Sequence, residues 1–277
     1  MFIFGQITKM RIKVFDIYRN RTLSYFLLIV VLALGLRVAR ACIDDNLDKD
    51  SVIYMWMANK AAAGNFYDAA ALNERMPPLY ISAMAAGEYI GIGAYNTGMA
   101  VSILAGTLLL IPVFWLGKTI FDEKIGLIAA IIVATHPYLI RISAEIMRDS
   151  LFLLLLFAGL AYAVRATMGK SCYFWCVPGI FAGLAVMTRT EGIELLVAAM
   201  VWFAIEIYLA FRIGSGKKFL ARALLSLFCL SAAFLIVTVP VQILLSKTPS
   251  TWGPVDQRIA GFYHGFMGNY QSGNMKK

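Results

Sequence analysis

The stretch TLSYFLLIVVLALGLRVARACIDDNLDKD, residues 22–50, joins the first apolar run of the chain to its densest group of acidic residues. Residues 22–36 carry no charge, and four aspartates then fall within seven positions: Asp44, Asp45, Asp48 and Asp50. A long uncharged apolar run preceded by basic residues is typical of a helix that spans a membrane. The aspartates therefore belong either to a solvated loop or to a polar site at the membrane surface.

The composition of the whole chain supports the membrane assignment. Its 277 residues are 60% hydrophobic and 15% charged, and the mean hydropathy is +0.73, whereas soluble domains carry roughly 25% charged residues. The net charge of +9 is explained by membrane topology. The polar segments contain no basic stripe with interleaved aromatic residues, so the charge does not indicate nucleic-acid binding. The four cysteines are scattered and form neither a disulfide framework nor a zinc pattern.

Charge-poor runs predict an all-α integral membrane protein with about seven transmembrane helices. The first helix is interpreted as an uncleaved span, because its basic lead-in is long and arginines occupy the region where cleavage would occur. The seven helices are expected at roughly residues 22–41, 97–119, 125–138, 149–166, 173–188, 192–212 and 221–246.

These helices define the expected organisation of the chain. A cytoplasmic segment at residues 1–21 precedes a membrane module at 22–246 that has an external loop at 42–96, and an external tail follows at 247–277. Basic residues in the N-terminal segment and in the loop RIGSGKK, 212–218, favour a cytoplasmic N-terminus and an external C-terminus in the plasma (inner) membrane. Eleven acidic residues then map to the outer face, and acids contribute little to orientation. We therefore expect the outer face to use carboxylates.

The external loop contains two segments that resemble helices lying in the membrane interface. SVIYMWMANKAAAG, 51–64, places apolar residues at helical spacing beside interfacial aromatics. PPLYISAMAAGEYIG, 77–91, is too short and too rich in glycine to span comfortably. Both patterns predict interfacial helices.

Three polar clusters fall on the same predicted side of the membrane. The first is the aspartate loop, the second contains Arg141, Glu145 and Asp149, and the third contains Arg189 and Glu191. The spacing i, i+4, i+8 in the second cluster predicts one face of a continuing helix. Any single pair could simply be an ion pair that makes a helix end soluble. Convergence of three clusters favours a functional site, since ionisable residues at membrane depth are costly.

Such a site suits transfer of a group from a lipid-phosphate carrier. A carboxylate can deprotonate an acceptor hydroxyl or amine, and an arginine can hold a phosphate bidentately. A groove facing lipid would admit an isoprenoid tail. Other chemistries lack their marks, because the chain has no P-loop, no H-E-x-x-H and no G-x-S-x-G motif.

The ordered motifs of the chain resemble a known superfamily between about residues 22 and 200. These motifs are DSVIYMWMANKAAAGNFYD at 50–68, PPLY at 77–80, LGKTIFDEKIGLIAAIIVATHPYLIRISAEIMRDSLFLLLLF at 116–157 and GIFAGLAVMTRTEGIELL at 179–196. They are similar to those of the protein O-mannosyltransferase and aminoarabinose-transferase superfamily, whose members are polyprenyl-phosphate-sugar glycosyltransferases of the GT-C fold.

The resemblance implies a role for each matching residue. Asp50 would be the first-loop aspartate that acts as general base or orients the acceptor, and Tyr54, four residues later, would help to bind the substrate. Asp149 with Glu145 would be the acidic pair before the fourth helix. Arg189 or Arg141 would neutralise the departing phosphate; Arg189 and Glu191 belong to the R-x-E-G turn, and Arg75 is the basic residue near the proline pair. No cofactor is obligatory, although Asp48 and Asp50 could bind a divalent cation.

The implied function is inverting transfer of a sugar from a polyprenyl-phosphate carrier to a lipid, glycan or protein acceptor on the external face. Members of the superfamily usually continue beyond the position where this chain stops, so we expect a C-terminally truncated member whose missing region a partner chain could supply. Two alternatives are an inactive paralogue or subunit of a glycosyltransferase complex, and a non-catalytic transporter of lipid-linked sugars. The sequence names neither the sugar nor the acceptor.

Overall fold

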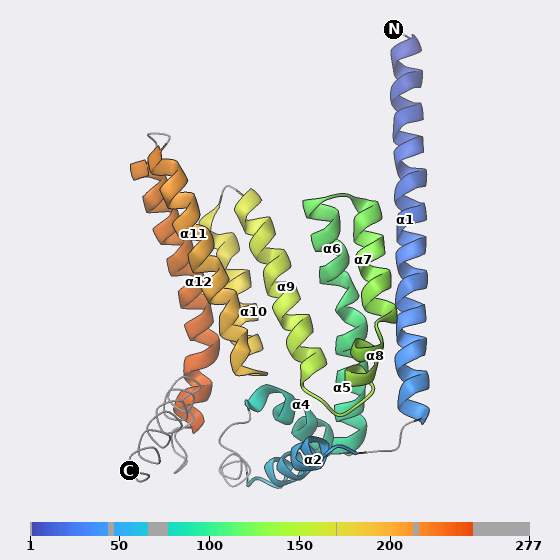
Figure 1. The fold of residues 1–277 in the computed structure, drawn as a ribbon, viewed down its shortest axis with the longest axis vertical. Helices are drawn as coiled ribbons and strands as arrows, with labels where there is room; N and C mark the ends of the chain where they lie inside the picture. Colours follow the sequence, from blue (N-terminus) through green and yellow to red (C-terminus); the bar gives the residue numbers. More distant parts are fainter. Residues whose placement is uncertain (1, 44–46, 66–76, 170, 213–215, 246–277) are drawn as a thin grey trace, which may run out of the picture.

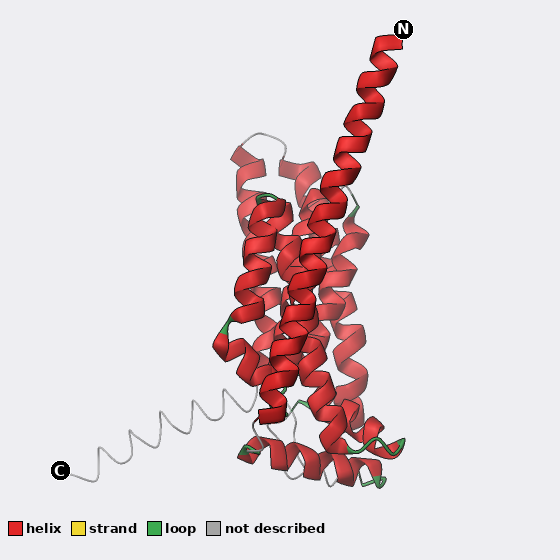
Figure 2. Cartoon of the chain, turned by 90° about the vertical axis from the view of Figure 1, so that its right-hand side faces the viewer, coloured by secondary structure: helices red, strands yellow, loops and turns green. Residues whose placement is uncertain are grey.

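Long helices lie side by side along one axis, and two short helices cross their end (Figures 1 and 2). The computed structural model describes residues 2–43, 47–65, 77–169, 171–212 and 216–245. Within these ranges all regular elements are helices, in agreement with the predicted all-α class. The expected tail at 247–277 lies outside them.

The helices along the long axis follow the predicted apolar runs. They are α1 (Phe2–Ile43), α5 (Ala94–Leu108), α6 (Leu110–Ile120), α7 (Glu123–Thr135), α9 (Asp149–Met168), α10 (Cys176–Val186), α11 (Glu194–Arg212) and α12 (Gly216–Leu245). The shorter elements are α2 (Lys49–Ala62), α4 (Pro78–Tyr89), α8 (Pro137–Ser143) and two 3₁₀ turns, η1 (Cys172–Trp175) and η2 (Thr190–Ile193).

The described residues do not confirm the expected count of seven membrane spans. In the described ranges, five stretches are long and apolar enough to cross a membrane: Arg21–Ile43, Ala94–Ile120, Asp149–Met168, Thr190–Leu209 and Leu220–Ile243. The pair α7 and α8 makes a sixth if it is counted as one broken span. The segment Cys172–Val186 is apolar but shorter. Each of the seven predicted segments is therefore helical, and seven full spans are not established.

The third predicted helix, 125–138, breaks after Thr135, and the two parts are bent by 60°. Pro137 has no N–H to donate to the carbonyl of Val133, and it restricts the residue before it to an extended conformation. The fully buried Arg37 of α1 approaches the broken end, with Nη2 3.4 Å from the Val133 oxygen and Nη1 3.4 Å from the Ala134 oxygen. A cation at a helix C-terminus is favourable, so Arg37 stabilises the break.

Helices α2 and α4 form a layer across one end of the bundle, in agreement with the two helices expected in the external loop. A buried cluster of both helices includes Tyr54, Met57, Tyr80 and Met84, and Ile146 packs into it from the segment before α9. We call this end the α2 end. The chain turns there at 144–148 and 187–193, and at the opposite end, where α9 also ends, it turns at 121–122 (Figure 1). The described residues of the three predicted polar clusters thus share one end.

Candidate active site at the α2 end

An ion-pair network joins the second and third polar clusters. Asp149 is the first residue of α9, and Arg189 precedes η2 in an extended conformation. The Arg189 Nη1 donates to the Asp149 carboxylate, and its Nη2 lies 3.4 Å from Glu191 Oε1. All three side chains are between 24% and 29% exposed. This partial burial strengthens their attraction relative to a fully solvated pair.

The turn that carries Arg189 requires a glycine. The Arg189 N–H donates to the Ala185 carbonyl at 2.8 Å, and the Gly192 N–H donates to the Arg189 carbonyl at 2.9 Å. A Cβ on Gly192 would lie 2.4 Å from the Val186 backbone nitrogen, so no other residue fits without a backbone shift. The tight turn directs Arg189 towards the start of α9.

The charge of Arg189 is stabilised by its partners. Burial lowers the pKa of its guanidinium, but the hydrogen bond to Glu191 and the negative charges of Asp149 and Glu191 outweigh burial, so the pKa is raised. The guanidinium also lies over the Phe152 ring, 5.7 Å from the ring centroid. Arg189 is therefore positively charged, and it is held in place by the carboxylates on one side and by the Phe152 ring on the other.

The first turn of α2 is bound to the segment before Asp149. The Ser51 hydroxyl donates to the Ile146 carbonyl at 3.2 Å, and the Ser102 hydroxyl of α5 donates to the Met147 carbonyl at 3.0 Å. Tyr80 of α4 completes the network, because its hydroxyl lies 2.9 Å from that of Ser102. Three helices thus hold residues 146 and 147.

Tyr54 lies among the charges that the sequence predicted to converge. Burial raises the pKa of its phenol; the charge of Arg148 lowers it, those of Asp50 and Asp149 raise it, and that of Arg189 lowers it. The ring itself is buried, only 1% exposed, and packs edge-on against Tyr80. Asp50 itself is exposed and has no hydrogen bond or ion pair within the described residues. Its carboxylate is accessible beside the network.

Arg141 and Glu145 form a looser pair. The Arg141 Nε lies 3.7 Å from Glu145 Oε1, and Arg141 is 57% exposed. The expected continuous helix through these residues and Asp149 is wrong, because α8 ends at Ser143 and a turn occupies 144–148. Asp149 consequently pairs with Arg189 and does not share a helix face with Arg141.

Arg148 lies in the second polar cluster, and the sequence predicted no role for it. Its Nη1 atom is buried and has no hydrogen-bond partner among the described residues. A buried, unpaired donor is unfavourable unless a ligand or water satisfies it. Its position directly before Asp149 was the signal in the sequence, but the predicted roles went to Arg141, Glu145 and Asp149.

Two expected features of the site do not gain support from the described residues. The Asp48 carboxylate accepts from the Lys49 N–H at 2.8 Å and caps α2. No group of three or more His, Cys, Asp or Glu side chains in the described ranges could hold a metal. A divalent cation at Asp48 and Asp50 stays a prediction. Arg75 lies outside the described residues.

Side chains at the α2 end offer groups of the kinds that bind a phosphate and accept a proton. Arg148 offers an unpaired nitrogen atom, Arg141 is largely exposed, and Asp50 offers an unpaired carboxylate. No curated protein matches the sequence. Residues 76–241 match the family described as dolichyl-phosphate-mannose-protein mannosyltransferase. This match covers more than half of the chain and includes Asp149, Arg189 and Glu191, and the chain therefore belongs to this family of GT-C membrane glycosyltransferases.

Proposed function

We propose that this protein transfers a sugar from a polyprenyl-phosphate carrier to an acceptor on the external face of the plasma membrane, with inversion at the anomeric carbon. The observation that carries the proposal is the ion-pair network of Arg189 with Asp149 and Glu191 at the α2 end, beside which Arg148 keeps a buried, unpaired nitrogen. The family name makes a mannosyl group the first candidate sugar. A cytoplasmic N-terminus, favoured by the basic N-terminal segment, would place the α2 end outside.

Asp50 is proposed as the general base. In the reaction, the acceptor O–H or N–H gives its proton to the Asp50 carboxylate, and the acceptor atom attacks the anomeric carbon. The bond from that carbon to the phosphate oxygen breaks on the opposite side, and the phosphate leaves with the electron pair. An exposed, unpaired carboxylate fits this role because nothing in the described part of the chain competes for its lone pairs.

Arg148 and Arg141 are proposed to hold the departing phosphate. Arg189 already has two carboxylate partners, so we assign it to positioning Asp149 and the R-T-E-G turn. Arg148 has an unpaired buried nitrogen, and Arg141 needs to give up only a 3.7 Å contact with Glu145. Guanidinium groups that meet the charge formed in the transition state supply much of the rate in phosphate displacement.

The test compares two aspartates in the same helix turn. Membranes that contain the full chain receive polyprenyl-phosphate-mannose labelled in the sugar, and transfer to the lipid, glycan and protein fractions is measured. Asp50→Asn is expected to lower transfer by about 10²-fold or more. Asp48→Asn is the matched control, because asparagine caps a helix as well as aspartate, and it is expected to retain transfer within about twofold.

Each other outcome decides between the proposal and its alternatives. Equal transfer by wild type and Asp50→Asn would remove Asp50 as the base. If wild type leaves every tested polyprenyl-phosphate sugar intact yet binds it, a non-catalytic subunit or an inactive paralogue explains the chain better. Movement of intact donor across vesicle membranes, without breakage of the sugar–phosphate bond, would indicate a transporter.

A further inference from the structure

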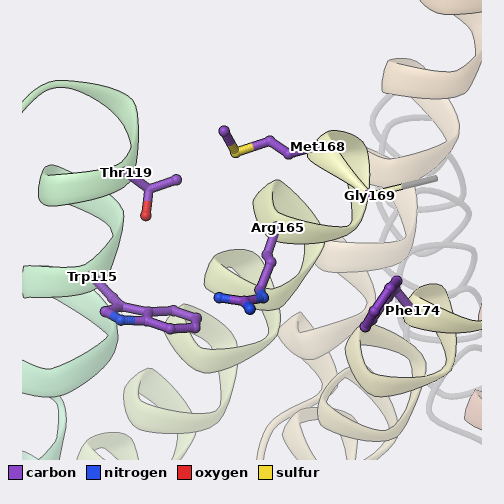
Figure 3. Close-up of a pocket in the computed structure, with 6 residues that line it drawn as sticks. All are labelled: Trp115, Thr119, Arg165, Met168, Gly169 and Phe174. Atoms are coloured by element: carbon purple, nitrogen blue, oxygen red, sulfur yellow. The ribbon is translucent and has the colours of Figure 1, made fainter. Parts of the chain in front are cut away.

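A cavity of about 400 Å³ opens between α6 and α9 at the end opposite the candidate active site (Figure 3). Trp115 and Thr119 line it from α6, and Arg165 lines it from α9, with the guanidinium pointing into the space between the helices. Met168, Gly169 and Phe174 form the remaining wall. The cavity thus combines one cation and one hydroxyl with an apolar surround.

Arg165 has no carboxylate partner within the described residues. Its guanidinium carbon lies 5.1 Å from the centroid of the Trp115 ring, and the side chain is exposed. Nearby, Lys118 is different, because it is neutralised by Glu123. The cavity therefore contains an uncompensated positive charge held against an aromatic face, which leaves guanidinium N–H donors available to an anion.

A second cavity of about 510 Å³ continues from Trp115 along the same pair of helices. Leu108 and Ile111 line it from the α5–α6 side, and Leu154 and Ala158 line it from α9. Trp115 lines both cavities, and Tyr162, which lines the second, lies 6.0 Å from Trp115 by ring centroids. The second cavity is almost wholly apolar, and it leads away from Arg165 towards the centre of the bundle.

We propose that these two cavities, which share Trp115, together bind an anionic glycerophospholipid, with its phosphate at Arg165 and Thr119 and an acyl chain in the apolar cavity. A cation at the membrane surface beside an apolar groove matches the two halves of such a lipid, and basic pockets between transmembrane helices bind anionic head groups. The indole of Trp115 suits the interface, where tryptophan is enriched. The site lies at the other end of α9 from Asp149 and is independent of the proposed transfer reaction.

Lipid binding to the purified full chain tests this proposal. Phosphatidylglycerol and phosphatidylcholine are titrated separately in a non-ionic detergent, and bound lipid is counted by native mass spectrometry. Phosphatidylglycerol is expected to bind more tightly, and Arg165→Gln is expected to weaken it about tenfold, the loss of one charge-assisted contact. Arg212→Gln is the matched control, because Arg212 also lies over an aromatic ring, 5.8 Å from Tyr208, but lines neither cavity.

A second variant tests the acyl-chain part without changing the charge. Ala158→Phe places a ring in the apolar cavity and is expected to weaken binding of phosphatidylglycerol while leaving the thermal unfolding midpoint of the empty protein near that of wild type. Equal weakening by Arg165→Gln and Arg212→Gln would overturn the proposal in favour of diffuse surface charge. Equal binding of the two lipids would do so as well. Displacement of phosphatidylglycerol by polyprenyl phosphate at lower concentration would assign the groove to the carrier instead.

Discussion

Arg189 at the α2 end and Arg165 at the opposite end are both arginines beside aromatic rings, yet their surroundings differ. Arg189 is 29% exposed and contacts two carboxylates. Arg165 is exposed and contacts a tryptophan ring. The first arrangement fixes the turn before η2 against the start of α9. The second leaves a positive charge that an anion can bind. The same residue type is structural at one end and available at the other because its partners differ.

The largest expected effect breaks the turn at the α2 end. Gly192→Ala would push a methyl group against the backbone at 185 and 186, and we expect a loss of ~3 kcal/mol in the free energy of unfolding. Gly35→Ala is the control, because a Cβ at Gly35 meets nothing within 4 Å. Thermal unfolding in detergent measures both. Equal midpoints for the two variants would show that the turn can relax.

The next effect compares the two arginines directly. Arg189→Met leaves two partly buried carboxylates without their cation, and we expect a loss of about 2 kcal/mol, below the value for fully buried pairs. Arg165→Met removes one exposed cation–π contact and should lose no more than about 1 kcal/mol. The unfolding midpoints of the two variants check this order. A larger loss for Arg165→Met would contradict the contrast between the ends.

A smaller, pH-dependent effect comes from Tyr54. Burial raises the pKa of its phenol in the folded protein, so the neutral form contributes stability below the unfolded pKa of about 10. This contribution is lost as the pH rises through the folded pKa. Between about pH 9 and pH 11, wild type should therefore lose more stability than Tyr54→Phe. Parallel pH profiles would show that the ring ionises without penalty.

The smallest effect is expected for an ion pair at the opposite end. Lys118 and Glu123 are 43% and 41% exposed, and exposed pairs contribute roughly 0–1 kcal/mol. Lys118→Met should lower the unfolding midpoint only slightly at low salt, and high salt should remove most of the difference. A loss as large as that of Arg189→Met would show that exposure does not separate the two ends.

Much of the architecture could be predicted from the apolar runs, because an apolar run in a membrane must satisfy its own backbone hydrogen bonds and therefore forms a helix. The break in the third predicted helix was foreseeable from Pro137, but the predicted boundary ran past it. The register of residues 141–149 was wrong for a different reason: periodicity cannot show where a helix stops when no proline or glycine marks the end. The turn at 144–148 is held by Ser51 and Ser102, which come from distant segments.

The contacts within the candidate site required the tertiary structure. Arg189 and Asp149 are 40 positions apart, and nothing in their local sequence distinguishes a partner from a free charge. The same limit applies to Arg37, which closes the broken end of α7 from a helix 96 positions away, and to Arg148, whose buried nitrogen is visible only in three dimensions.

Sequence alone determined that the chain is a helical membrane protein, and it predicted that the three polar clusters share one side. Each apolar side chain favours transfer into the bilayer by itself, so the apolar runs are visible in the sequence. Successive helices cross the membrane in opposite directions, which predicts the side on which each loop lies. The tertiary structure decided which of those charges are paired, capped or left accessible. Ion pairing depends on distances of a few ångströms between atoms of distant segments. Within residues 22–50, the tertiary structure distinguishes two aspartates that the sequence alone cannot tell apart. Asp48 caps α2, whereas the carboxylate of Asp50 remains accessible.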